Sequence, residues 1–202
     1  TKVAQLESQG THFVRWGAPD EAHPGVSIGC DNYQGGQSIT SHLIGLGKTS
    51  FAFIGDNGDH APEFKARFNG YFETLQSHGL DQSSVQRNAI STEDAGSEAV
   101  KSLLQSGELP QAIVCASDLI AMGVLRALRQ AKVNVPDDVA VVGYDNIAVS
   151  AYTTPSLTTV QQNTKLAGEL LVNTLLKAIN NEDVQDYLMP ADIIIRQSCG
   201  SE

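Results

Sequence analysis

A strand–helix–strand unit between residues 111 and 146 constrains the fold more than any other stretch. An apolar run at 112–115 is followed by the polar pair Ser117-Asp118, a typical helix N-cap, and then by an amphipathic pattern from 119 to 128. A second apolar run at 139–142 leads to Asp145 and Asn146. Polar residues therefore follow both strands, at the edge where open parallel sheets bind their ligands.

The same alternation of strand and helix patterns continues along the whole chain. We expect strands at 11–16, 26–30, 51–55, 85–90, 112–115, 139–142, 187–189 and 193–195. We expect a first helix that ends near residue 9. Further helices are expected at 35–46, at 62–78, from a cap at 91–94 to residue 105, from 117 to 128, and at 163–180. Regular alternation of this kind predicts an α/β protein with parallel sheet.

Composition limits the class of protein. The 202 residues, 41% of them hydrophobic, are enough for one large or two small domains with real cores. A net charge of -10 makes this segment a poor partner for nucleic acid or anionic membrane. The chain has no apolar run near the roughly 20 residues that span a bilayer, and its first residues lack the apolar region of a signal peptide.

The three cysteines indicate a reducing compartment. Cys30, Cys115 and Cys199 are an odd number at wide spacing, which favours reduced thiols in a cytoplasmic protein over disulfides or a metal site.

Short motifs spread over nearly the whole chain resemble the effector-binding core of the LacI/GalR family of bacterial transcription regulators. Each motif alone is weak, but their order and spacing together are specific. They are Asp31–Gly36, His42–Lys48, Ile54-Gly55, Arg67–Tyr71, Ala116–Gly123, Val135–Val139, Val142–Asn146, Leu157–Val160 and Ile195–Ser198.

This resemblance implies two doubly wound parallel-sheet subdomains of the periplasmic-binding-protein-like type I fold, joined by crossover strands, with a small ligand between them. Residues 1–29 plus 163–189 would form the N-terminal subdomain, and residues 30–161 plus 190–202 the C-terminal one. The family's helix-turn-helix and the first elements of its N-terminal subdomain have no counterpart here. We therefore expect an incomplete N-terminal subdomain and a longer parent protein that binds DNA.

Arg67 and Asp145 are the strongest candidates for ligand contact. Arg67 could be a solvated helix residue, but its neighbours are apolar and the family holds its effector with an Arg at this position. A guanidinium offers a fixed fork of donors, and a carboxylate accepts strong charge-assisted hydrogen bonds from hydroxyl groups. Asn146 is expected to shape the turn after Asp145.

Four further residues match or adjoin positions that line the family's binding site. Ser117 is a candidate polar contact, whereas its neighbour Asp118 is interpreted as a helix cap. Gln162 lies at the second crossover, and Cys30 lies at the first, where it either lines the site or belongs to the core. Glu63 lies one helical turn before Arg67 and could face the same ligand.

Trp16, the single tryptophan, leaves two alternatives open. It could pack in a core, or it could be a platform for the apolar face of a sugar ring. Arg15 should point to the opposite side of the same strand.

No catalytic, metal-binding or phosphate-binding constellation stands out. Cys30, Asp31 and His42 could be imagined as a nucleophile set, but nothing in the sequence orients them. Gly35-Gly36 precedes a helix without completing a phosphate-binding motif. We therefore expect a protein that is not an enzyme and uses neither a cofactor nor a metal.

The function indicated by the resemblance is the ligand-sensing core of a homodimeric transcriptional repressor. A sugar is the favoured effector, and a purine or nucleoside would suit similar residues. Exposed apolar residues on the helices that begin at Ser117 and Glu93, and around Tyr152, are candidates for the dimer interface. The alternative is a periplasmic sugar-binding protein that delivers solute to a transporter.

Overall fold

A computed structural model describes residues 5–6, 8–19, 25–80, 85–107 and 109–201 of the chain. The structure divides into two compact units. Unit 1 comprises Thr1–Asp31 and Gln162–Ala191, and unit 2 comprises Asn32–Gln161 and Asp192–Glu202. These boundaries differ by one or two residues from those expected for the two subdomains. Each unit is assembled from segments far apart in the sequence.

Unit 2 is built on a six-stranded sheet in the order β4-β3-β5-β6-β7-β9. The strands are β3 (Phe51–Ile54), β4 (Val85–Arg87), β5 (Ala112–Cys115), β6 (Ala140–Asp145), β7 (Thr158–Gln161) and β9 (Asp192–Ile194). The first five strands in this order run parallel, as predicted. The edge strand β9 runs antiparallel to β7, which the sequence did not predict.

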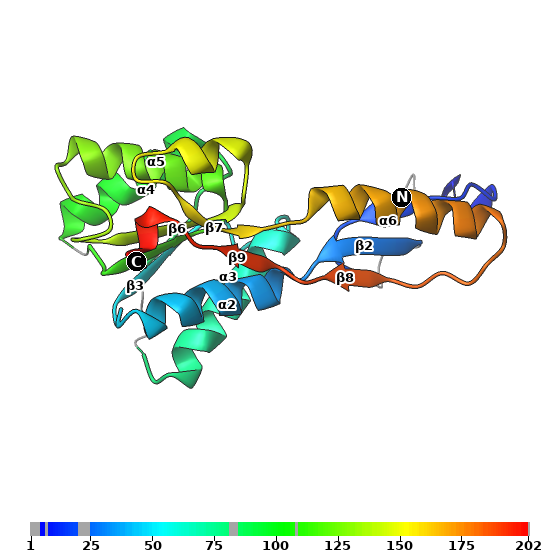
Figure 1. The fold of residues 1–202 in the computed structure, drawn as a ribbon, viewed down its shortest axis with the longest axis horizontal. Helices are drawn as coiled ribbons and strands as arrows, with labels where there is room; N and C mark the ends of the chain where they lie inside the picture. Colours follow the sequence, from blue (N-terminus) through cyan, green and yellow to red (C-terminus); the bar gives the residue numbers. More distant parts are fainter. Residues whose placement is uncertain (1–4, 7, 20–24, 81–84, 108, 202) are drawn as a thin grey trace. The chain divides into compact units, whose positions relative to one another are not determined.

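Two pairs of helices cover the two faces of this sheet (Figure 1). One pair is α2 (Asn32–Gly45) with α3 (Pro62–Ser77), and the other is α4 (Glu93–Ser106) with α5 (Asp118–Gln130). The apolar runs of β3 and β5 are buried throughout, because helices cover both of their faces. The unit also contains two short 3₁₀ helices, η1 (Ala148–Tyr152) and η2 (Gln197–Cys199).

Close packing of α2 on α3 depends on glycine. A Cβ atom on Gly36 would lie 2.2 Å from the carbonyl oxygen of Arg67, and one on Gly70 would lie 2.1 Å from that of Tyr33. The two backbones meet at distances that no larger residue allows, so this contact fixes where α3 carries the Arg67 side chain.

Unit 1 contains the three-stranded parallel sheet β1-β2-β8, formed by β1 (Val14–Trp16), β2 (Val26–Cys30) and β8 (Tyr187–Met189). The helix α6 (Thr164–Ile179) packs on β1 and β2. A small apolar cluster of Cys30, Ala167, Met189 and Leu170 joins them. Several large apolar side chains of α6 and β8 are exposed, among them Val172, Leu176 and Tyr187.

Predicted elements correspond to observed ones, with differences at their ends. β1 begins at Val14 rather than at residue 11, and β4 ends at Arg87 rather than at residue 90, while α2 begins three residues earlier than expected. The helix expected to end near residue 9 lies partly outside the described residues. None of the described helices is long and apolar enough to cross a bilayer.

Candidate effector site at the carboxyl edge of the sheet

Arg67 of α3 and Asp145 of β6 meet at the carboxyl edge of the unit 2 sheet. The Arg67 Nη2 atom lies 3.3 Å from Asp145 Oδ1, so the two strongest sequence candidates form an ion pair. The Arg67 side chain is 5% exposed and the Asp145 side chain 31% exposed. One carboxylate therefore remains accessible beside a buried cation.

Three further groups hold the Arg67 guanidinium in place. Its Nε–H donates to Asn32 Oδ1 at 2.8 Å, and Nη1–H donates to the carbonyl oxygen of Ala116 at the end of β5. The guanidinium carbon lies 3.7 Å from the centroid of the Tyr144 ring and 5.2 Å from that of Phe64. The interpretation of Arg67 as a solvated helix residue is thus wrong, because α2, β5 and β6 all contribute to its burial.

The turn that follows β6 is strained. Asp145 has a φ of 106° and Asn146 a φ of 50°, both in the region that favours glycine. Such a conformation costs a non-glycine residue on the order of 1–3 kcal/mol, which the surrounding structure must offset. Asn146 shapes this turn as predicted: its N–H donates to Thr159 Oγ1, and its side-chain oxygen accepts from Arg196 at 2.7 Å.

Ser117 has the capping role expected for Asp118, and Asp118 belongs to a buried hydrogen-bond network. Ser117, not Asp118, is the N-cap of α5, since its Oγ accepts from the N–H of Ile120, and it also bonds Ser91 Oγ at 2.8 Å. Ser117 is 1% exposed. The fully buried Asp118 carboxylate instead accepts from the N–H of Ile147 at 2.9 Å and from Thr159 Oγ1 at 2.6 Å.

Burial raises the pKa of Asp118 to about 6, with Asp145 adding to the rise, while the bonds from Thr159 and Ile147 and the nearby Arg196 oppose it. A carboxyl whose pKa is higher in the folded state stabilises the fold below its unfolded pKa of 3.8, and this contribution is lost as the pH rises through about 6.

We therefore expect the pH dependence of stability to change in Asp118→Asn, which cannot ionise. The free energy of unfolding of the variant minus that of the parent should rise by about 2 kcal/mol from pH 4 to pH 7. Urea denaturation across this range measures it. A difference that stays constant with pH would mean that Asp118 titrates normally.

Comparison with known proteins reveals the family. Residues 40–199 match the family described as periplasmic binding protein-like domain. The chain is 32% identical over 195 residues to the HTH-type transcriptional repressor PurR of Glaesserella parasuis serovar 5 (strain SH0165), covering 91% of this chain and 56% of that one. It is 34% identical over 184 residues to the HTH-type transcriptional regulator RegA of Clostridium saccharobutylicum, covering 89% and 54%.

This chain belongs to the LacI/GalR family. The solved complex of the transcriptional regulator CelR with cellobiose has a TM-score of 0.86 and 31% identity, over 96% of this chain and 60% of that one. The chain spans about half the length of the regulators PurR and RegA. The named relatives are regulators, which favours regulation over the transport alternative, and the periplasmic-binding-protein-like fold expected from the motifs is confirmed.

Of the remaining candidate residues of this LacI/GalR core, Glu63 shares α3 with Arg67, and the other three belong to unit 1. Glu63 is half-buried in the first turn of α3. Trp16, Cys30 and Gln162 belong to unit 1. Trp16 is 47% exposed, so its interpretation as a core residue is wrong, whereas Cys30 is 2% exposed and packs with Ala167 and Met189 as a core residue would.

The two cysteines of unit 2 are buried, which disfavours a role for either thiol as a nucleophile. Burial raises the pKa of the Cys115 thiol, which disfavours its thiolate. The Cys199 sulfur lies 3.5 Å from His42 Nε2 and is fully buried, and desolvation lowers the pKa of His42. Within the described ranges, no group of three His, Cys, Asp or Glu side chains could hold a metal ion.

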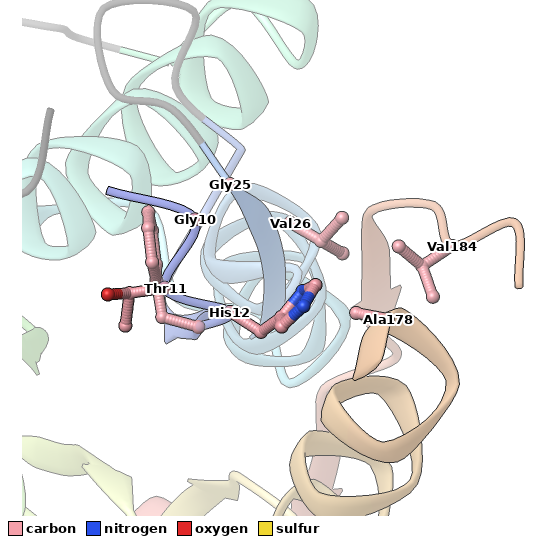
Figure 2. Close-up of a pocket in the computed structure, with 8 residues that line it drawn as sticks. Gly10, Thr11, His12, Gly25, Val26, Ala178 and Val184 are labelled. Carbon is pink, nitrogen blue, oxygen red and sulfur yellow. The ribbon is translucent and has the colours of Figure 1, made fainter. Parts of the chain in front are cut away.

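A pocket of about 280 Å³ lies in unit 1, away in sequence from the ion pair (Figure 2). The His12 ring extends toward Ala178, and Gly25, Val26 and Val184 also line the pocket. Among the described residues that line it, His12 is the one titratable side chain. The pocket offers a sugar or carboxylate far fewer polar partners than the edge at Arg67.

Sequence reasoning missed three residues of the site. Asn32 and Tyr144 lie inside quoted motifs but carry no local sign of a contact with Arg67. Arg196 is 50 residues from its partner Asn146, so only the fold brings them together. The available signal was their presence in family motifs, which gives no role to a side chain.

Proposed function

We propose that this chain is the effector-sensing core of a LacI/GalR transcriptional repressor, and that the effector binds at the carboxyl edge of the unit 2 sheet. The observation that carries the proposal is the buried Arg67, paired at 3.3 Å with the partly exposed Asp145. Burying a cation is costly unless it is paired, so a fold that holds one at a ligand-binding edge is a functional-site candidate.

The chemistry of the pair favours a neutral, hydroxyl-rich effector. A guanidinium carries five N–H groups. Arg67 makes two hydrogen bonds and one ionic contact with the protein, and each of its three nitrogens takes part in one of them. One N–H on each terminal nitrogen lies outside these contacts, beside a carboxylate that accepts from hydroxyls. The charges of Arg67 and Asp145 cancel, which suits a sugar better than a phosphorylated compound.

The class of effector also has support from a relative. The CelR complex contains cellobiose. The proposed effector of this chain is therefore a sugar, with a purine or nucleoside as the second candidate because its amines and hydroxyls would suit the same pair. Ser117, Gln162, Trp16, Cys30 and Glu63 remain predicted contacts that rest on the resemblance, and the burial of Ser117 and Cys30 makes these two the weakest.

Titration of the complete protein with a panel of sugars, sugar phosphates and nucleosides tests the proposal. The expected result is calorimetric binding of a neutral sugar. Asp145→Asn should weaken this binding about 10- to 100-fold, because hydrogen bonds to a carboxylate exceed those to an amide. Asn tolerates positive φ as Asp does, so the variant should keep the turn.

Lys65→Ala is the matched control, since Lys65 lies on α3 two residues before Arg67 and pairs with the exposed Asp59. Its affinity should equal that of the parent. Sugar binding that is equally tight in Asp145→Asn and in Lys65→Ala would refute the assignment of the site.

Effector binding would control DNA binding in the complete repressor. A ligand that binds one conformation more tightly shifts the population toward it, and this is sufficient to change affinity for operator DNA. The DNA-binding domain would lie outside this chain, whose acidic charge makes it a poor DNA partner. We assign the repressor to the cytoplasm, with no catalytic activity, cofactor or membrane partner.

The proposed repressor is a homodimer, and Tyr152 is the leading interface residue. Tyr152 is 84% exposed and Val149 46% exposed on η1, beside a hollow lined by Met122, Leu125 and Arg126 of α5. Tyrosine is enriched among the residues that contribute most to protein–protein interfaces, and here it lies beside other exposed apolar atoms. Tyr152→Glu should convert a dimer to a monomer in light scattering, whereas an unchanged mass would place the interface elsewhere.

A further inference from the structure

The strained turn at Asp145 and Asn146 is held by side chains from three other segments of unit 2. Asp118, at the start of α5, lies beneath the turn and accepts the N–H of Ile147 at 2.9 Å. The absence of a side chain at Gly143 makes room for it, because a Cβ atom there would lie 2.2 Å from Asp118 Oδ1. The buried carboxylate therefore anchors the backbone just after the turn.

Thr159 of β7 links Asp118 to the turn a second time. Its Oγ1 accepts the N–H of Asn146 at 3.3 Å and donates to Asp118 Oδ1 at 2.6 Å. Both backbone N–H groups that follow Asp145 thus have partners in one buried network. An amide at position 118 could not offer acceptors on both sides.

Arg196, which follows β9, holds the turn from the side chain of Asn146. Its Nη2–H donates to Asn146 Oδ1 at 2.7 Å, while Nη1–H donates to the carbonyl oxygen of Leu157 at 2.7 Å and to Ser150 Oγ at 3.1 Å. A planar guanidinium reaches these three acceptors at once, which a lysine cannot. The C-terminal segment is in this way tied to the turn that carries Asp145.

We infer that Asp118 and Arg196 are positioning residues that clamp the Asp145–Asn146 turn and thereby present the Asp145 carboxylate to the effector. The claim that the clamp presents Asp145 to the effector rests on the proposed function. Neither residue needs to touch the effector, since each acts through the turn. The strain at the two positive φ angles explains why a clamp is required, because an unrestrained turn would relax away from this conformation.

Amide hydrogen exchange of the complete protein tests the clamp without a ligand. Asn146→Gly accepts the positive φ freely but loses the bond to Arg196, and Arg196→Lys keeps the charge but loses the fork. Each should speed exchange of the Ile147 N–H at least tenfold and leave exchange in β5 unchanged. Unchanged exchange at Ile147 in both variants would overturn the inference.

Asn181→Gly is the matched control for Asn146→Gly. Asn181 also has a positive φ, 58°, but is exposed after α6 in unit 1. In this variant the Ile147 N–H should exchange at the parent's rate. An exchange rate at Ile147 as high as in Asn146→Gly would show that the effect is not local to the clamp.

Calorimetric titration with ribose and cellobiose tests the presentation of Asp145. Whichever of the two sugars binds the parent should bind Asn146→Gly and Arg196→Lys at least fivefold more weakly. In an Asp145→Asn background the same substitutions should cause no further loss of affinity. Fully additive losses would overturn the positioning role, because a merely structural residue acts independently of Asp145. Failure of both sugars to bind the parent, or normal affinity in Asp145→Asn, would count against the proposed function, and hydrogen exchange would then decide the clamp.

Discussion

Replacing Arg67 by Met should lower the free energy of unfolding by about 2–3 kcal/mol and abolish effector binding. Removing one partner of a buried ion pair leaves the other without its counter-charge, at a cost of about 3–5 kcal/mol for a fully buried pair. The lower figure is expected here because the Asp145 side chain is 31% exposed and water can reach it. Chemical denaturation and calorimetric titration measure the two effects.

A second substitution separates the charge of Arg67 from its packing. Adding Asp145→Asn to Arg67→Met removes the uncompensated carboxylate, so the double variant should recover part of the lost stability and none of the binding. Recovery of binding would contradict a direct role for the pair. If the double variant is less stable than the single one by the full cost of a second independent change, the two side chains are not coupled.

Gly36→Ala should destabilise the protein by about 3 kcal/mol, near the upper end of overpacking effects, because the new methyl group would meet backbone. Its Cβ atom would lie 2.2 Å from the carbonyl oxygen of Arg67, so α2 and α3 must separate. Effector affinity should fall as well, since α3 carries Arg67. Thermal and chemical denaturation give the first quantity, and titration gives the second.

Gly45→Ala, in the same helix, is the control for this prediction. A Cβ atom at Gly45 would meet nothing within 4 Å, so the helix should gain a few tenths of a kcal/mol from the better propensity of alanine. Equal losses at the two glycines would mean that the contact between α2 and α3 is not the cause.

Much of the fold was predictable because it depends on local patterns. The apolar runs of β3, β5 and β6 follow from short stretches of sequence. The strand β7 was not predicted, since Thr158 and Thr159 interrupt its apolar run. Both are fully buried, because their hydroxyls bond Asp118, Arg196 and Cys199 across the unit.

The candidate site was predictable only in part, because most of its contacts join residues that are distant in the sequence. Arg67 and Asp145 meet because a helix and a strand of a parallel sheet converge at one edge, which is a rule of topology. The roles of Asp118, Arg196 and Asn32 depend on hydrogen bonds between residues that are tens of positions apart in the sequence. No local pattern records such contacts, and the cap interpretation of Asp118 was wrong because Ser117 occupies that role.

The most direct measurement is a crystal structure of the complete protein with a sugar that binds in the titration. We expect density for the sugar within hydrogen-bond distance of both the Arg67 guanidinium and the Asp145 carboxylate, with the Asp145–Asn146 turn unchanged. A sugar bound elsewhere, with Arg67 and Asp145 in contact with protein groups alone, would contradict the assignment of the effector site to this ion pair.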